Sequence, residues 1–181
     1  VLRVDFETMV DNTARDHRLR VHFPAEIKTE SADFDSHFQV IRRSLTQPEG
    51  GPDWVETPRP ECPQRAFTTI TDGHKGLTLA NRGLPQIEVM KTQSGTEIAL
   101  TLLRCVGWLS RDDFSTRKGH AGPMMETPGA QEIGRHVFHY ALIPHVEGWT
   151  QAEPLVRNFE AAMRAVPMPI QNGLLPPANQ M

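Results

Sequence analysis

The stretch EIALTLLRCVGW, from Glu97 to Trp108, is a long apolar run that decides the fold class. Along an extended strand, successive side chains point to opposite faces of the sheet. Ile98 and Leu100 therefore share one face. Ala99 and Leu103 lie on the other, so both faces of this strand are apolar. A strand covered on both sides belongs at the centre of a two-layer structure, so we expect it inside a β-sandwich.

Two segments near the beginning of the chain alternate apolar and polar residues, as half-buried strands do. In residues 2–10 the polar positions include the acidic Asp5 and Glu7, and in residues 17–23 they include the basic Arg18 and Arg20. Opposite charges on neighbouring strands stabilise a sheet. We therefore predict that these two segments pair with each other as an antiparallel hairpin.

Further strands are predicted where apolar residues alternate between turns rich in Gly, Pro and Asp. They cover residues 36–45, 65–71, 76–80, 86–91, 97–108 and 134–144. One helix is predicted near Gln151–Ala165, because Thr150 and Glu153 fit a capping box. The apolar residues of this segment also recur at helical spacing, namely Leu155, Phe159, Ala162 and Val166.

The predicted fold is therefore mainly β, with an antiparallel sandwich over residues 1–150 and a helix over 151–166 that packs on it. Residues 167–181 form a Pro-rich tail. Hydrophobic residues make up 38% of the chain and charged residues 23%, which suits a packed core. The formal net charge of -3 argues against a nucleic-acid-binding protein, and no apolar stretch is long enough to span a bilayer.

The two cysteines give no sign of a metal site or a redox motif. Cys62 and Cys105 lie far apart, and neither belongs to a CxxC pair. We expect reduced thiols in a cytoplasmic protein, although the sequence leaves a disulfide between them open.

The histidines and aspartates do not form a catalytic or metal-binding group in the sequence pattern. His136 and His139 are three apart in a predicted strand, so they point to opposite faces and cannot chelate one ion. Asp112 and Asp113 are adjacent, so their side chains diverge and do not form the pair of acids that glycoside hydrolysis needs. No GxSxG motif and no Gly-rich phosphate loop is present.

Four arginines fall at strand ends in the middle of the chain: Arg82, Arg104, Arg111 and Arg117. A planar guanidinium holds carboxylates or sugar hydroxyls in a fixed geometry. The alternative is that these arginines tie loops to the rim of the sandwich, and the sequence leaves both roles open.

Four motifs in order give the chain a family resemblance. They are RVDFETMVDNTARDHRLRVHFP, RAFTTITDGHKGLTLANRGLPQIEV, IALTLLRCVGWLSRDD and AGPMMETPGAQEIGRHVFHYALIPH. Together they resemble the C-terminal β-sandwich region of family 38 glycoside hydrolases, the α-mannosidases, and especially the bacterial members that include mannosylglycerate hydrolases. The resemblance covers about Leu2 to His145.

This resemblance implies a galactose-mutarotase-like supersandwich of antiparallel strands. In the family, the nucleophilic aspartate, the acid/base carboxylate and the zinc ligands lie in an N-terminal barrel-like domain. None of those motifs occurs in this sequence, so the resemblance assigns no catalytic residue and no metal ligand here. It implies that the zinc belongs to a separate N-terminal domain.

The resemblance also sets expectations for partners. The sequence starts at Val1 in strand-like alternation and without a methionine, so we expect a piece of a longer protein. The implied partners are the N-terminal catalytic barrel of the same polypeptide and a mannosidic carbohydrate, with no nucleic acid and no membrane. Self-association into a homo-oligomer is left open. Some family members bring an arginine of this region near the sugar, and the candidates here for the rim of that cleft are Asn81, Arg82 and Arg104.

Two other functions stay as alternatives. A free-standing aldose epimerase would need a histidine acid and a glutamate base around one sugar, for which His136, His139 and Glu88 can be nominated. A non-catalytic carbohydrate-binding sandwich would present aromatic rings to sugar faces, for which Trp54 and Trp149 are the candidates in predicted loops.

Overall fold

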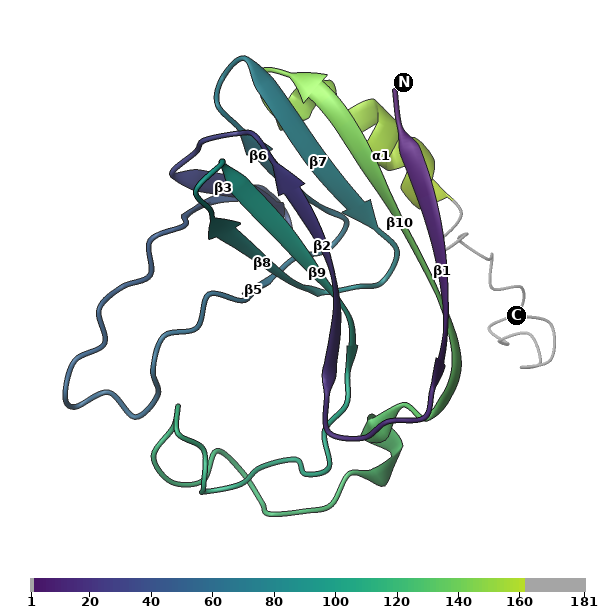
Figure 1. The fold of residues 1–181 in the computed structure, drawn as a ribbon. Coiled ribbons are helices and arrows are strands. Elements are labelled where there is room, and N and C mark those ends of the chain that lie inside the picture. Colours follow the sequence, from purple (N-terminus) through teal and green to yellow (C-terminus); the bar gives the residue numbers. More distant parts are fainter. Residues whose placement is uncertain (1, 162–181) are drawn as a thin grey trace, which may run out of the picture.

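Two antiparallel sheets face each other in the computed structural model, which describes residues 2–161 (Figure 1). One sheet has six strands in the order β1-β10-β7-β6-β3-β4, and the other has four in the order β2-β9-β8-β5. The strands are β1 (Val4–Asn12), β2 (Arg18–Ala25), β3 (Ser31–Asp35), β4 (Val40–Ser44), β5 (Cys62–Pro63), β6 (Phe67–Thr71), β7 (Lys75–Asn81), β8 (Gln86–Lys91), β9 (Thr96–Arg104) and β10 (Gly134–Val146). The predicted antiparallel β-sandwich is thus confirmed.

The main core lies between the two sheets and is made of the inward-facing residues of both. Its fully buried side chains are Phe34, Ile70, Leu79, Ile87, Ile98 and Leu100. Burying one such side chain contributes about 1.5–3 kcal/mol, so this layer is the main source of stability. All of these residues except Phe34, which lies in β3, belong to strands that the alternation of apolar residues predicted.

The apolar strand β9 lies between β2 and β8 in the smaller sheet. Its face with Ile98 and Leu100 contacts the core, as expected. Ala99 faces away from the core and is still fully buried, although no second sheet lies on that side. The predicted strand was also too long, because residues 105–108 leave the sheet and begin a loop.

The predicted hairpin between the first two strands is wrong. β1 pairs with β10 in one sheet and β2 pairs with β9 in the other. The two strands instead meet through their apolar faces, where the rings of Phe6 and Phe23 lie 5.8 Å apart between the sheets. The alternation predicted correctly which side chains point inward. The basic residues of β2 do not pair with β1, however, because Arg18 binds Glu61 and Arg20 binds Glu88.

The strand predicted over residues 36–45 was only partly right. It contains β4, but residues 36–39 connect β4 to β3, a strand that was not predicted. The missed strand β3 carries two aspartates, which are uncommon in strands. Asp33 accepts two hydrogen bonds from Arg42, and Asp35 is bound by Arg65, so both carboxylates are compensated.

The helix α1 (Glu153–Glu160) follows a 3-10 turn at Trp149–Gln151, and both lie within the predicted segment or at its edge. The predicted capping box does not form, because the residue before the helix is Ala152 and Glu153 instead binds Arg157. Val156 and Phe159 are buried. The predicted helical positions Ala162 and Val166 and the tail 167–181 lie outside the described residues.

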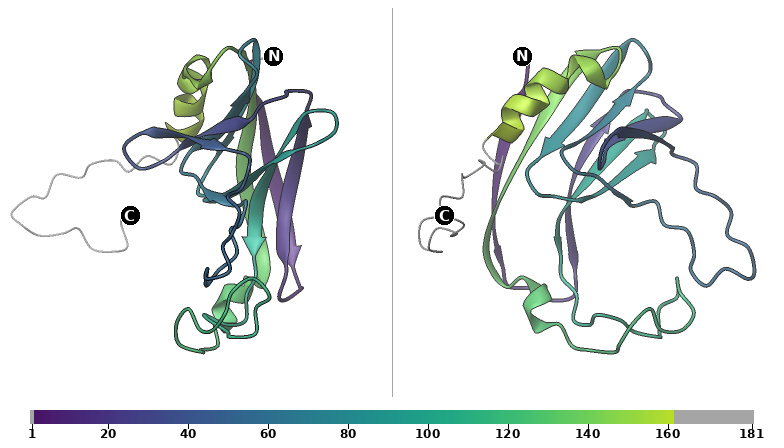
Figure 2. Two further views of the ribbon diagram at one scale, coloured as in Figure 1. Left: turned by 90° about the vertical axis from the view of Figure 1, so that its left-hand side faces the viewer. Right: turned by 180° about the vertical axis from the view of Figure 1, so that it is seen from behind.

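This helix packs on the outer face of the six-stranded sheet, away from β2 and β9 (Figure 2). There its buried side chains contact Phe67, Ala80 and Ala141, which point away from the main core. Among the described residues, no helix is long and apolar enough to cross a membrane.

Candidate functional site

Two long loops project from one end of the sandwich and meet there (Figure 1). One connects β4 to β5 and the other follows β9. The amide of Thr57 donates a hydrogen bond to the carbonyl of Thr116 at 2.8 Å, and the amide of Lys118 donates to that of Val55 at 2.9 Å. The loops are therefore held together by a short antiparallel bridge.

A cavity of about 670 Å³ lies beneath this bridge, and we call it the loop cavity. Its walls come from both loops, from the start of β2 and from the end of β9. Its polar lining includes the side chains of His17, Arg18, Glu61, Gln86, Arg104 and Arg117. It is the largest cavity described in the structured part of the chain.

Ion pairs fill one wall of the loop cavity. Arg18 binds Glu61 at 2.5 Å, and Arg59 lies 3.6 Å from the same carboxylate. Burial by itself would raise the pKa of Glu61, but the hydrogen bond and charge of Arg18, with the help of Arg59, lower it overall. Glu61 is therefore an ionised structural partner rather than a general acid.

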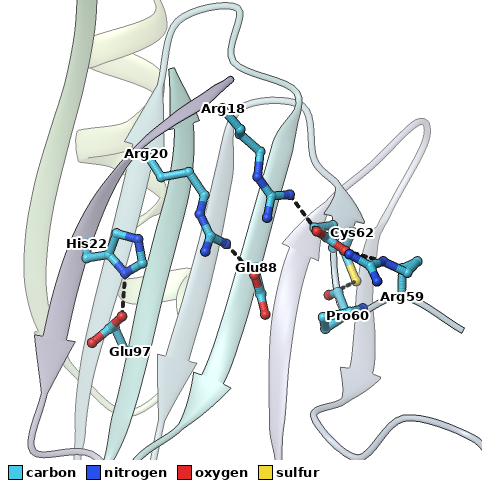
Figure 3. Close-up of polar contacts among 9 residues, drawn as sticks. Arg18, Arg20, His22, Arg59, Pro60, Cys62, Glu88 and Glu97 are labelled. Carbon is cyan, nitrogen blue, oxygen red and sulfur yellow. Dashed lines mark hydrogen bonds and ion pairs between the residues drawn. The ribbon is translucent and has the colours of Figure 1, made fainter. Parts of the chain in front are cut away.

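The same pattern continues along the outer face of the four-stranded sheet (Figure 3). Arg20 on β2 binds Glu88 on β8, and because β9 lies between these strands, the pair crosses over it. His22 binds Glu97 at 2.5 Å beside it. This layer of charged side chains explains why Ala99 is fully buried on a face that no second sheet covers.

This geometry separates the residues nominated for an aldose epimerase. Glu88 alternates with the core residues Ile87 and Val89, so it lies on the outer face of the smaller sheet. His136 and His139 are on β10 in the other sheet, where His139 lies 3.8 Å from Glu7. The acid and base candidates are on different sheets and do not surround one site.

The three residues predicted at the rim of a sugar cleft have different surroundings. Asn81 is buried, and its side chain accepts a hydrogen bond from the amide of Leu84 at 2.7 Å. Arg82 donates two hydrogen bonds to the carbonyl of Phe159, at 3.0 and 2.8 Å, and its guanidinium lies over that ring. Arg104 is exposed, lines the loop cavity and has no ion pair within residues 2–161.

The acidic residues of the loop after β9 are used locally. Arg111 Nε donates to Asp113 at 2.8 Å, whereas Asp112 lies 3.4 Å from His120. The adjacent aspartates thus turn to different partners, as expected for loop residues. In the described range 2–161, no group of three or more His, Cys, Asp or Glu side chains could hold a metal ion.

Three residues that line the loop cavity each have one buried side-chain atom without a hydrogen-bond partner among the described residues. These atoms are Nδ1 of His17, Oε1 of Gln86 and Nε of Arg117. Buried polar groups are nearly always paired, so such atoms call for an explanation. Of these residues, the sequence singled out only Arg117. No pattern pointed to His17 or Gln86, because the two loops and two strands meet only in the folded chain.

Both cysteines are free in the structure. Cys105 is buried beside the loop cavity, where desolvation raises the pKa of its thiol. Desolvation also raises the pKa of the half-buried Cys62 thiol. Neither thiol is activated as a nucleophile.

Comparison with known proteins agrees with the resemblance carried by the four motifs. Residues 2–115 match the model of the glycosyl hydrolases family 38 C-terminal domain. The chain is 35% identical over 136 residues to a protein of Halalkalibacterium halodurans named "Putative mannosylglycerate hydrolase". That match covers 75% of this chain and 13% of the relative.

Two solved structures from Enterococcus faecalis have the same fold. An α-mannosidase of strain V583 is 33% identical, with a TM-score of 0.69, and a protein of glycosyl hydrolase family 38 is 31% identical, with a TM-score of 0.67. Each match covers 90% of this chain and 16% of the solved one. The chain thus spans only about a seventh of the length of these relatives. It belongs to glycosyl hydrolase family 38, within the C-terminal β domain of these enzymes.

Proposed function

We propose that this chain is the β domain of a retaining α-mannosidase, in which it supports a catalytic barrel in the same polypeptide and lines part of its substrate cleft. The match of residues 2–115 to the family's C-terminal domain carries this proposal. The similarity to an α-mannosidase of known structure supports the linkage, since that relative is named for it.

In this proposal the chain supports the barrel and forms part of the surface of the substrate cleft, whereas the barrel carries the catalytic residues. Of the carboxylates that line the loop cavity, Glu56 and Glu61 are held in ion pairs and Asp16 accepts a hydrogen bond from Gln131, so they are poorly suited to act as a nucleophile or an acid. The described residues do not fit a zinc ion either. In this proposal the zinc and the catalytic aspartate lie in the barrel, and the 181-residue chain has no turnover of its own.

The loop cavity is the part of this domain that we propose to face the substrate. It is rich in arginine, since Arg18, Arg59, Arg104 and Arg117 all line it. The planar guanidinium groups at its wall can donate hydrogen bonds to the oxygens of sugar hydroxyl groups.

The test compares the 181-residue chain with the full-length polypeptide that contains it. Both are assayed for hydrolysis of an aryl α-mannoside, with zinc and after treatment with a chelator. We expect zinc-dependent turnover by the full-length protein and none by the chain alone. Zinc-dependent hydrolysis by the isolated chain would contradict the proposal, and so would a full-length protein that cleaves no α-mannoside.

A further inference from the structure

A second cavity lies on the outer face of the six-stranded sheet, between α1 and the turn that connects β3 to β4, and we call it the helix cavity. Its volume is about 450 Å³, which is within the range of small-molecule binding sites. The turn contributes residues 36–39 to its wall, and α1 contributes Glu153, Arg157 and Glu160. The helix cavity and the loop cavity have no lining residue in common.

Phe38, in the turn, is the lining residue that the fold explains least. Its φ is 73°, in the left-handed region that bulky residues rarely adopt, and its ring is fully exposed. The amide of Ser36 donates a hydrogen bond to the carbonyl of Gln39 at 3.1 Å, so the turn requires only a residue that tolerates this conformation, such as Gly or Asn. Backbone strain of this kind is concentrated at functional sites. The ring of Phe38 therefore calls for a ligand.

A second aromatic ring, that of Trp149, lines the same cavity. Trp149 is half-buried and lies against the buried ring of Phe67, with the ring centroids 5.9 Å apart. This packing holds the indole in place at the start of the 3-10 turn before α1. A fixed aromatic surface in a cavity suits the apolar C–H faces of a sugar ring.

The charged side chains of the helix cavity are paired with one another. Arg65 lies 2.9 Å from Asp35 and 3.6 Å from Glu160. Arg157 Nε donates a hydrogen bond to Glu153 at 2.8 Å. Each of these five side chains has a partner of opposite sign, so the cavity offers no free counter-charge to an ionic ligand.

The same ion pairs can still bind hydroxyl groups. A carboxylate that accepts one or two hydrogen bonds keeps further lone pairs, and a paired guanidinium keeps further N–H donors. A sugar hydroxyl both donates and accepts, so it can bind to either partner of such a pair. Aromatic rings beside a few planar polar groups are the combination that a neutral sugar requires.

From these groups we infer that the helix cavity binds a neutral oligosaccharide. The rings of Phe38 and Trp149 contact the C–H faces of its sugars, and the ion-paired side chains bind its hydroxyl groups. This inference goes beyond the proposed function, because the chain itself holds the oligosaccharide and needs no catalytic barrel to do so.

The first experiment locates the ligand on the chain. The 181-residue chain is titrated with an α-linked mannotetraose and with maltotetraose, and the indole Nε–H signals of its three tryptophans are followed by NMR. Trp54 and Trp108 do not line the helix cavity, so they are internal controls. We expect a saturable shift of the Trp149 signal with at least one tetrasaccharide and no shift of the other two signals. No shift of Trp149 with either sugar, or an equal shift of all three signals, would overturn the inference.

The second experiment tests the strained ring. Phe38→Asn removes the ring but keeps a residue that tolerates the left-handed turn. We expect the Kd for the tetrasaccharide that shifts Trp149 to rise about tenfold or more, while the midpoint of urea unfolding does not fall. The matched control is Trp54→Asn, an exposed aromatic residue that lines neither cavity, for which we expect an unchanged Kd.

Three results of this second experiment would contradict the inference. They are an unchanged Kd in Phe38→Asn, an equal rise in Trp54→Asn, and a lower urea midpoint in Phe38→Asn, which would mean that the ring serves folding instead.

The third experiment asks whether the cavity is open in the full-length polypeptide. The chelator-treated protein is run in a native gel that contains a soluble polymer of the sugar that shifted Trp149. We expect the wild type to be retarded and Phe38→Asn to be retarded less. Equal mobility of the two proteins would mean that another part of the polypeptide covers the cavity, and it would overturn the inference. The aryl α-mannoside assay is independent of this result, so failure of this inference and failure of the proposed function remain distinguishable.

Discussion

The two outer faces of the sandwich are covered in opposite ways. On the six-stranded sheet, α1 lays Val156 and Phe159 over small apolar residues such as Ala141. On the four-stranded sheet, the ion pair of Arg20 and Glu88 crosses over β9. Both devices remove strand residues from water, but the first relies on apolar area and the second on charge.

The difference shows that a buried position in a strand does not reveal what covers it. Ala141 and Ala99 are both fully buried. Ala141 is covered by an apolar helix, which contributes through the hydrophobic effect. Ala99 lies between His22 and Glu88 in the sheet register, on the face where the long side chains of Arg20 and Glu88 pair. The two faces should therefore respond differently to mutation, salt and pH.

The largest effect is expected on the helix-covered face. Phe159→Ala removes a buried ring that also lies 4.4 Å below the guanidinium of Arg82. Because a cavity is left behind, the free energy of unfolding should fall by about 3–5 kcal/mol. Urea unfolding of the 181-residue chain measures it. The control is Val137→Ala, an exposed apolar residue of β10, for which we expect less than about 1 kcal/mol. Similar losses for the two variants would mean that α1 contributes little to this face.

A smaller effect is expected on the ion-paired face. Glu88→Gln leaves the partly buried Arg20 without its carboxylate, so the free energy of unfolding should fall by about 1–3 kcal/mol. The matched control is Glu97→Gln, since the pair of Glu97 with His22 is more exposed and should contribute less than about 0.5 kcal/mol. If both variants lose the same stability, burial of the pair is not what makes this covering effective.

The smallest effect concerns pH on the six-stranded face. Burial lowers the pKa of His145, whose ring hydrogen-bonds to Thr78 and lies where a side chain at Gly76 would be. The folded state therefore favours the neutral ring. Its contribution to stability is complete above the unfolded pKa of about 6.5 and is lost as the pH falls below that value. Urea unfolding is measured at a series of pH values from 7.5 to 5, about half a unit apart. As the pH falls, the free energy of unfolding should decrease less steeply in His145→Asn than in the wild type. Parallel pH profiles would contradict this assignment.

Much of the fold was predictable because alternation at period two is a local property. It identified the inward side chains of β1, β2 and β9. Pairing was not predictable in the same way, because a face pattern does not say which strand lies beside which. The charges of Arg18 and Arg20 matched the acidic residues of β1, yet Glu61 and Glu88 compete for them and are the actual partners.

The candidate site was only partly predictable. Arg104 was nominated among the arginines near strand ends, and the structure places it at the wall of the loop cavity. Arg82 had the same signal, but its partner is a carbonyl at the end of α1, which no sequence pattern places nearby. His17 and Gln86 became candidates only through burial without a partner, and burial depends on the folded loops.

The separation of β1 and β2 into different sheets has a consequence for how the protein is made. β1 and β2 are edge strands, one in each sheet, and both come from the beginning of the chain. Thr8 meets Tyr140 across 132 positions, and His22 meets Glu97 across 75. On the ribosome, β2 can therefore dock once β9 has emerged, whereas β1 must wait for β10. Until then the six-stranded sheet has an open edge at β7, which makes late synthesis the stage at which this domain is most exposed to misassociation.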